Sequence, residues 1–168
     1  VHAGMPVLLL SAGQAGATAP AAIAGAVAQA LSEVIAGLIY VNAMVPGHPC
    51  IVGTWPFVSD LRTGAMSGGS GEQGLLTACC AQMLQHYGLP GGAAAGMSDS
   101  KMPDAQSGYE KGSTLVMAGL SGLNMVYEAA GMHASLLGFC LESLIIDNDM
   151  LGQCLRCVRG IEVNDDTI

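Results

Sequence analysis

The sequence predicts an α/β fold, a (β/α)8 barrel of which this chain of 168 residues forms about half. A short apolar run, a loop of small residues and a longer segment with helical spacing follow one another four times. Strands that alternate with helices in this way indicate a parallel sheet with crossover helices. Four such units are half the number in a closed barrel, and an open doubly wound sheet is the alternative fold.

The first two units have the clearest strands. Residues 6–10 are all apolar, as in a strand that is buried on both faces. A helix is predicted over residues 20–44, because proline is favoured in a first helical turn and a Pro-Gly pair ends the pattern. The strand of the second unit is predicted over residues 50–54, and a long loop follows it up to residue 69.

The helix of the second unit is predicted over residues 71–86. Ser70 followed three positions later by Gln73 is typical of a capping box, in which the two residues satisfy backbone N–H groups at the start of a helix. The Gly-x-Gly-x-x-Gly pattern at residues 69–74 does not indicate a dinucleotide site, because no buried strand comes directly before it.

The last two units are less regular. The third has a weak strand over residues 91–96, a polar loop over 97–103 and a helix over 104–130. The fourth has a strand over residues 133–139 and a helix over 144–159. We therefore expect Glu142 to lie just beyond the end of the fourth strand.

Composition excludes several classes of protein. Five Lys and Arg residues against 13 Asp and Glu residues give a formal net charge of −8, which excludes the basic surface that binds nucleic acid. Charged residues are only 11% of the chain, where soluble domains average about 25%. We therefore expect a homo-oligomer, or an internal fragment, residues 1–168, of a single larger domain.

Neither a membrane span nor a signal peptide is predicted. The apolar stretch over residues 19–45 is long enough to cross a bilayer, but Glu33 and three other polar residues interrupt it. The first residues contain no basic segment of the kind that begins a secretory signal. We expect a cytoplasmic location.

No metal site is predicted. Cys154 and Cys157 form a Cys-x-x-Cys pattern without a second pair, so we interpret them as helix-packing residues. The four His residues are scattered. A zinc-dependent methyltransferase would need three Cys or His ligands at strand ends, and Cys140 is the only cysteine near such a position.

Polar and aromatic side chains follow each predicted strand, where barrel enzymes place their chemistry. An aromatic pair beside carboxylates suits a quaternary ammonium ion, although both rings can equally pack the loop against the barrel. Asp99 and Lys101 can equally form a local ion pair. The candidates are Gln14 after the first strand, Trp55, Phe57, Asp60 and Arg62 after the second, Ser98, Asp99 and Lys101 after the third, and Glu142 after the fourth.

Five segments resemble the trimethylamine methyltransferase family, and together they extend over essentially the whole chain. They are residues 8–18, 60–66, 98–111, 145–150 and 159–163. The resemblance implies a (β/α)8 barrel that moves a methyl group from a methylamine to the cob(I)alamin of a partner corrinoid protein. Archaeal trimethylamine enzymes carry pyrrolysine. This chain has only standard residues, so it is similar to the members that act on glycine betaine and other quaternary amines.

Loop position and residue type, rather than the family, suggest the individual roles. Trp55 and Phe57 would hold the cation, with Gln14 and Ser98 as further substrate contacts. Asp60, Asp99 or Glu142 would supply a negative field, and Lys101 or Arg62 would pair with a betaine carboxylate. We predict Asp99, Lys101 and Glu142 as catalytic residues and the remaining six as substrate-binding residues. A barrel that binds a quaternary amine without turnover is the alternative function.

Overall fold

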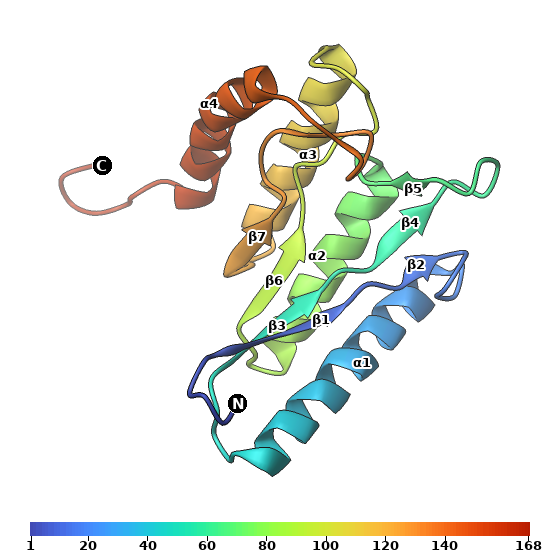
Figure 1. The fold of residues 1–168 in the computed structure, drawn as a ribbon. Helices are drawn as coiled ribbons and strands as arrows, with labels where there is room; N and C mark the ends of the chain where they lie inside the picture. Colours follow the sequence, from blue (N-terminus) through green and yellow to red (C-terminus); the bar gives the residue numbers. More distant parts are fainter.

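The computed structural model describes all of residues 1–168 and confirms an α/β architecture with a parallel sheet (Figure 1). The main sheet consists of β1 (Val7–Ser11), β3 (Cys50–Thr54), β6 (Gly91–Ala94) and β7 (Met125–Tyr127). The helices are α1 (Ile23–Met44), α2 (Gly71–His86), α3 (Ala105–Leu120) and α4 (Leu141–Arg159). The short strands are β2 (Gln14–Ala15), β4 (Phe57–Ser59), β5 (Met66–Ser67), β8 (Met132–His133) and β9 (Gly138–Phe139).

The four strands of the main sheet lie side by side in chain order, β1-β3-β6-β7, and all neighbours are parallel. Along the same direction α1 packs on α2, α2 on α3 and α3 on α4, so successive helices form one layer (Figure 1). A doubly wound sheet would reverse its strand order at a switch point. No such reversal occurs in this sheet.

The main apolar core lies between the helix layer and the sheet. Helices α1 and α2 each present an apolar face to the strands, and side chains from both helices and from β3 pack together there. Burial in this layer raises the pKa of the Cys80 thiol to about 12. The core residues include Val27, Leu31 and Val34 of α1, Val52 of β3, and Leu76, Cys80 and Leu84 of α2.

Helix α1 is long and apolar enough to cross a membrane by length and composition alone. Six of its residues are nevertheless buried in the protein. The four polar residues that interrupt its apolar run also have hydrogen-bond partners. Glu33 accepts hydrogen bonds from the Ser11 hydroxyl (2.6 Å) and from the Gln29 amide (2.9 Å), which ties the helix to the end of β1.

The opposite face of the sheet is apolar and is open to solvent along β1. Leu9 points toward α1, where its side chain lies close to Gly37. Its neighbours Leu8 and Leu10 point the other way and are 47% and 49% exposed. Met125 of the edge strand β7 is exposed to a similar extent. This face is therefore open along β1 and at Met125, whereas Ala94 of β6 is buried in a cluster with Phe57 and Met97.

The predicted third helix and fourth strand were wrong in their extent and position. Helix α3 ends at Leu120, and the fourth strand of the sheet is β7 rather than residues 133–139. Gly122 adopts φ +82° and ends the helix, and the Asn124 side chain then accepts a hydrogen bond from the Gly91 amide (2.9 Å), which aligns β7 beside β6. Residues 133–139 instead belong to the antiparallel hairpin of β8 and β9.

The long loop predicted after the second strand contains two short strands. β4 pairs with β5 and with β2, forming a second small sheet beyond the end of the main one. The predicted cap is half confirmed: the Ser70 hydroxyl accepts from the Gln73 amide N–H (3.2 Å), but the Gln73 side chain turns inward to Pro56 and Val58. Gln73 thus fixes this small sheet against α2.

A buried ion pair joins the last two helices. The Lys111 ammonium of α3 has no exposed surface and lies 2.6 Å from the Asp147 carboxylate of α4. Asp147 also accepts a hydrogen bond from the Gly131 amide (2.7 Å), at the base of the β8–β9 hairpin. This single carboxylate therefore positions α3, α4 and the hairpin relative to one another.

We predict that Lys111→Met lowers the free energy of unfolding by about 3–5 kcal/mol, because it leaves the Asp147 carboxylate buried without a counter-ion. The double variant Lys111→Met/Asp147→Asn removes both charges and keeps an acceptor for Gly131, so we expect it to lose less. Urea denaturation of the complete protein, followed by circular dichroism, measures both. A double variant as unstable as the single one would contradict this account.

Candidate functional site

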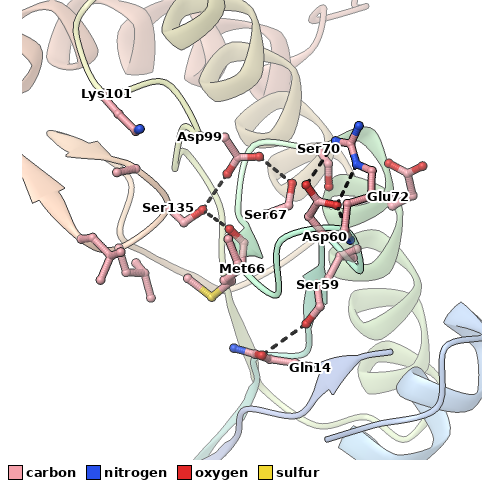
Figure 2. Close-up of a pocket in the computed structure, with 16 residues that line it drawn as sticks. Gln14, Ser59, Asp60, Met66, Ser67, Ser70, Glu72, Asp99, Lys101 and Ser135 are labelled. Carbon is pink, nitrogen blue, oxygen red and sulfur yellow. Dashed lines mark hydrogen bonds and ion pairs between the residues drawn. The ribbon is translucent and has the colours of Figure 1, made fainter. Parts of the chain in front are cut away.

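A cavity of about 990 Å³ lies where the segments after four successive strands of the main sheet come together (Figure 2). β2 follows β1, the β4–β5 segment follows β3, the loop with Asp99 and Lys101 follows β6, and the β8–β9 hairpin follows β7. The carboxyl ends of parallel strands are where such folds bind ligands. Of the predicted residues, the cavity brings together Gln14, Asp60, Arg62, Asp99 and Lys101.

The Asp99 carboxylate connects the walls of this cavity (Figure 2). Both of its oxygens accept hydrogen bonds, and the donors come from the end of β5 and from the tip of the hairpin. The donors are the Ser67 hydroxyl (2.5 Å), the Gly68 amide (2.7 Å), the Gly69 amide (3.3 Å) and the Ser135 hydroxyl (2.6 Å). Asp99 is therefore a residue that holds other groups in place.

A second carboxylate lies directly behind Asp99. Glu110 of α3 is buried and accepts from the Ser98 hydroxyl (2.7 Å) and the Asp99 amide (2.8 Å). Gly69 packs so closely against Glu110 that a Cβ atom at this position would overlap its carboxylate. This close approach explains why the sequence requires glycine there.

Asp60 and Arg62 neutralise each other on the β4–β5 turn. The Arg62 guanidinium donates two hydrogen bonds to the Asp60 carboxylate, both at 3.1 Å. These bonds lower the pKa of Asp60 from 3.8 to about 2 and raise the pKa of Arg62. The two charges therefore compensate each other, although the Arg62 side chain remains 89% exposed.

Two charged side chains that line the cavity have no partner. Lys101 and Glu72 are exposed, and neither forms an ion pair or a side-chain hydrogen bond. Figure 2 shows them on opposite sides of the cavity, with Asp99 and Ser67 between them. The cavity thus offers one free cation and one free anion to a ligand.

The predicted aromatic cage is not open. Phe57 is buried in an apolar cluster with Met97, and neither it nor Trp55 lines the cavity. The Trp55 ring lies 6.0 Å from Phe57 at 77° and 5.0 Å from Tyr127 at 60°. Rings in such contact leave no room for a trimethylammonium group between them, so the packing interpretation of these two residues holds here.

Ser98 and Glu142 also lie outside the cavity. Ser98 is fully buried and bound to Glu110. Glu142 lies in the first turn of α4 and is exposed. Because residues 133–139 form a hairpin rather than a strand of the main sheet, Glu142 does not follow the carboxyl end of a strand of that sheet, where a catalytic role was expected.

The sequence analysis missed most of the residues that line the cavity, among them Ser67, Glu72, Ser135 and Met66. Ser67 and Glu72 flank a Gly-rich turn at a helix start, which is a detectable signal. Ser135 has none, because its place depends on a left-handed backbone (φ +60°) at the hairpin tip and on a bond to a residue 36 positions away.

No three His, Cys, Asp or Glu side chains gather where they could hold a metal ion. Cys140, the candidate of the zinc alternative, caps α4 instead: its sulfur accepts from the Ser143 amide at 3.4 Å. Cys154 is buried and Cys157 is exposed, so the Cys-x-x-Cys pair does not present two thiols to one site.

Comparison with known proteins gives one consistent result. The sequence model of the family described as trimethylamine methyltransferase (MTTB) matches residues 1–168. A glycine betaine methyltransferase of Desulfitobacterium hafniense (strain Y51) is 37% identical over 165 residues, which are 98% of this chain and 34% of the relative. The trimethylamine methyltransferase MttB of Methanosarcina barkeri (strain Fusaro / DSM 804) is also 37% identical, over 98% of this chain and 33% of its own length.

A further relative, the trimethylamine methyltransferase MttB of D. hafniense (strain DSM 10664 / DCB-2), is 34% identical over 99% of this chain and 34% of its own length. The chain therefore spans about a third of the length of the curated relatives it matches. Identity does not separate the relative named for glycine betaine from the first one named for trimethylamine.

We predict that the pKa of Asp60 is about 2 in the folded protein and rises toward 3.8 in Arg62→Gln. A lowered pKa in the folded state stabilises the protein above pH 4, and this stabilisation is lost as the pH falls toward 2. Carboxyl chemical shifts measured by NMR against pH test both values. An unchanged pKa in the variant would show that Arg62 is not the cause.

We predict that Gly69→Ala lowers the free energy of unfolding by about 1–3 kcal/mol, because the added methyl group displaces Glu110. Gly71→Ala is the matched control: it lies two residues away, and a Cβ atom there meets nothing within 4 Å. Thermal or urea denaturation compares the two variants. Equal stability of both would disprove the close packing described for Gly69.

Proposed function

Because the chain belongs to the trimethylamine methyltransferase (MTTB) family, we propose that its protein moves a methyl group from a methylated or quaternary amine to the cob(I)alamin of a corrinoid protein. The observation that carries the proposal is the polar cavity at the carboxyl ends of the parallel strands. Its walls are cross-linked through Asp99, so it is a formed site rather than a gap between loops.

The fold part of the proposal is that residues 1–168 form about half of a (β/α)8 barrel within a longer, cytoplasmic and homo-oligomeric protein. Strands in chain order with helices on one side are consistent with it. The apolar face of the sheet that is open along β1 would then point into the barrel, where further strands bury it. The relatives, which are about three times as long as this chain, have the length for such strands.

The chemistry explains why this cavity needs no acid or activated nucleophile. In a quaternary amine the nitrogen already carries a positive charge, so it leaves as a neutral tertiary amine and keeps the electron pair of the broken C–N bond. The cob(I)alamin acceptor supplies the pair that forms the new bond to the methyl carbon. What remains for the protein is to orient the methyl group and to exclude water.

The choice of a quaternary amine over trimethylamine rests on the residues of this chain. Trimethylamine is not a leaving group until its nitrogen is activated, and this chain contains only standard residues, without the pyrrolysine that the family resemblance associates with trimethylamine enzymes. A site that only orients its substrate suits a quaternary amine, because its positively charged nitrogen is already a leaving group.

We predict that the complete protein, mixed with cob(I)alamin and a panel of methylated amines, forms methylcobalamin with a quaternary amine and not with trimethylamine. The visible absorbance of the cobalamin follows the reaction. Asp99→Ala is expected to lower the rate by about 100-fold or more, because small misplacements of the reacting groups have effects of that size. Asp149→Ala, which removes an exposed carboxylate on α4, is the matched control and keeps the wild-type rate.

Each outcome of this experiment decides between the two functions. Turnover of trimethylamine alone would overturn the quaternary-amine proposal. Tight binding of a quaternary amine without any methyl transfer would favour the alternative, a barrel that binds the amine without turnover.

A further inference from the structure

We propose that Lys101 determines substrate specificity by pairing with a carboxylate, so that the cavity selects a quaternary amine that also carries an acid group, a betaine. This inference rests on the proposed function and extends it from the reaction to the substrate class. It assigns the role to Lys101 and not to Arg62, although both are basic residues lining the same cavity.

The assignment follows from which Lys and Arg side chains already have a partner in the protein. The chain has only five Lys and Arg residues. Arg62 is held by Asp60, Lys111 is buried against Asp147, and Arg156 donates to a backbone carbonyl at the end of α4. Lys101 is therefore the only cation at the cavity without a partner.

Lys101 is free although the backbone beside it is fixed. The carbonyl of Ser100 accepts hydrogen bonds from the Ala134 amide (2.8 Å) and from the His133 ring (3.2 Å), and the Ser100 hydroxyl donates to Asp104 (2.9 Å). The ammonium group is thus presented from a rigid loop, which reduces the ordering that binding requires. A lysine whose backbone is fixed and whose ammonium group has no partner suits the recognition of an anion.

The surroundings match the rest of a betaine. The Ala134–Ser100 bond places the hairpin tip next to Lys101, and Ala134, Leu136 and Leu137 of this tip line the cavity. Their apolar surface suits N-methyl groups. The nearby carboxylate of Asp99 is occupied by four hydrogen-bond donors, so it competes less for Lys101 and repels a substrate carboxylate less than a free one would.

The test compares two ligands that share a trimethylammonium group and differ in the other end. Glycine betaine has a carboxylate, and choline has a hydroxyl group. Titration calorimetry on the complete protein measures binding of each without requiring turnover. We expect Lys101→Gln to weaken glycine betaine binding by about 10- to 100-fold, the usual loss for a charge-assisted hydrogen bond, and to change choline binding by less than about 2-fold.

Two further variants make the result specific. Lys101→Arg keeps the charge and is expected to recover part of the affinity for glycine betaine. Arg159→Gln removes an equal charge from an exposed position at the end of α4 and is expected to have no effect on either ligand. Loss of both ligands in Lys101→Gln, no loss of either, or no binding of glycine betaine to the wild type would overturn the inference.

The acceptor is a second source of an anion, because cobalamin carries a phosphodiester. Steady-state kinetics separate the two sources. Pairing with the substrate raises the KM for glycine betaine and leaves the KM for cob(I)alamin unchanged in Lys101→Gln. A rise in the KM for cob(I)alamin alone would assign Lys101 to the acceptor and overturn the inference. Binding without turnover in the wild type would refute the proposed function while leaving the calorimetric test of Lys101 intact.

Discussion

The hydrogen bonds to the Asp99 carboxylate are the interaction on which the candidate site depends. They join the end of β5, the loop after β6 and the tip of the β8–β9 hairpin, three segments with no strand pairing between them. A buried donor left without a partner costs about 1–3 kcal/mol. Four donor groups approach this one carboxylate, and the Ser135 hydroxyl also lies 2.7 Å from the Met66 carbonyl, so this network favours the observed arrangement of the three segments.

This constraint changes how the charges at the strand ends should be interpreted. A carboxylate that follows a strand of a parallel sheet suggests a catalytic role. Asp99 and Asp60, however, both accept hydrogen bonds from other residues of the protein. A charged side chain with partners inside the protein holds the site together, whereas a charged side chain without a partner is free to bind a ligand. By this criterion Lys101 and Glu72 face the ligand, and only the first of them was identified from the sequence.

The regular parts of the fold could be predicted from local signals. Residues 6–10 are all apolar and residues 50–54 are largely so. The helices that follow them begin near a proline and at the Ser70 cap, so strands and helices differ clearly there. Prediction failed over residues 121–139. There the apolar run around Met125 fits a helix as well as a strand, and the choice depends on a bond between Asn124 and Gly91, which are distant in sequence. Among the missed site residues, Ser135 depends on the same kind of long-range contact.

The division between residues that hold the cavity wall together and residues that are free to meet a ligand also bears on the proposed substrate preference. The bonds of Asp99 and Glu110 involve backbone amides and serines of the cavity wall and do not include Lys101. A change at Lys101 therefore leaves the bonds that hold the wall in place. Under the proposal made for Lys101, the same scaffold can serve a methylated amine with a carboxylate or one without it, because Lys101 is attached to the bonded cavity wall and takes no part in its hydrogen bonds.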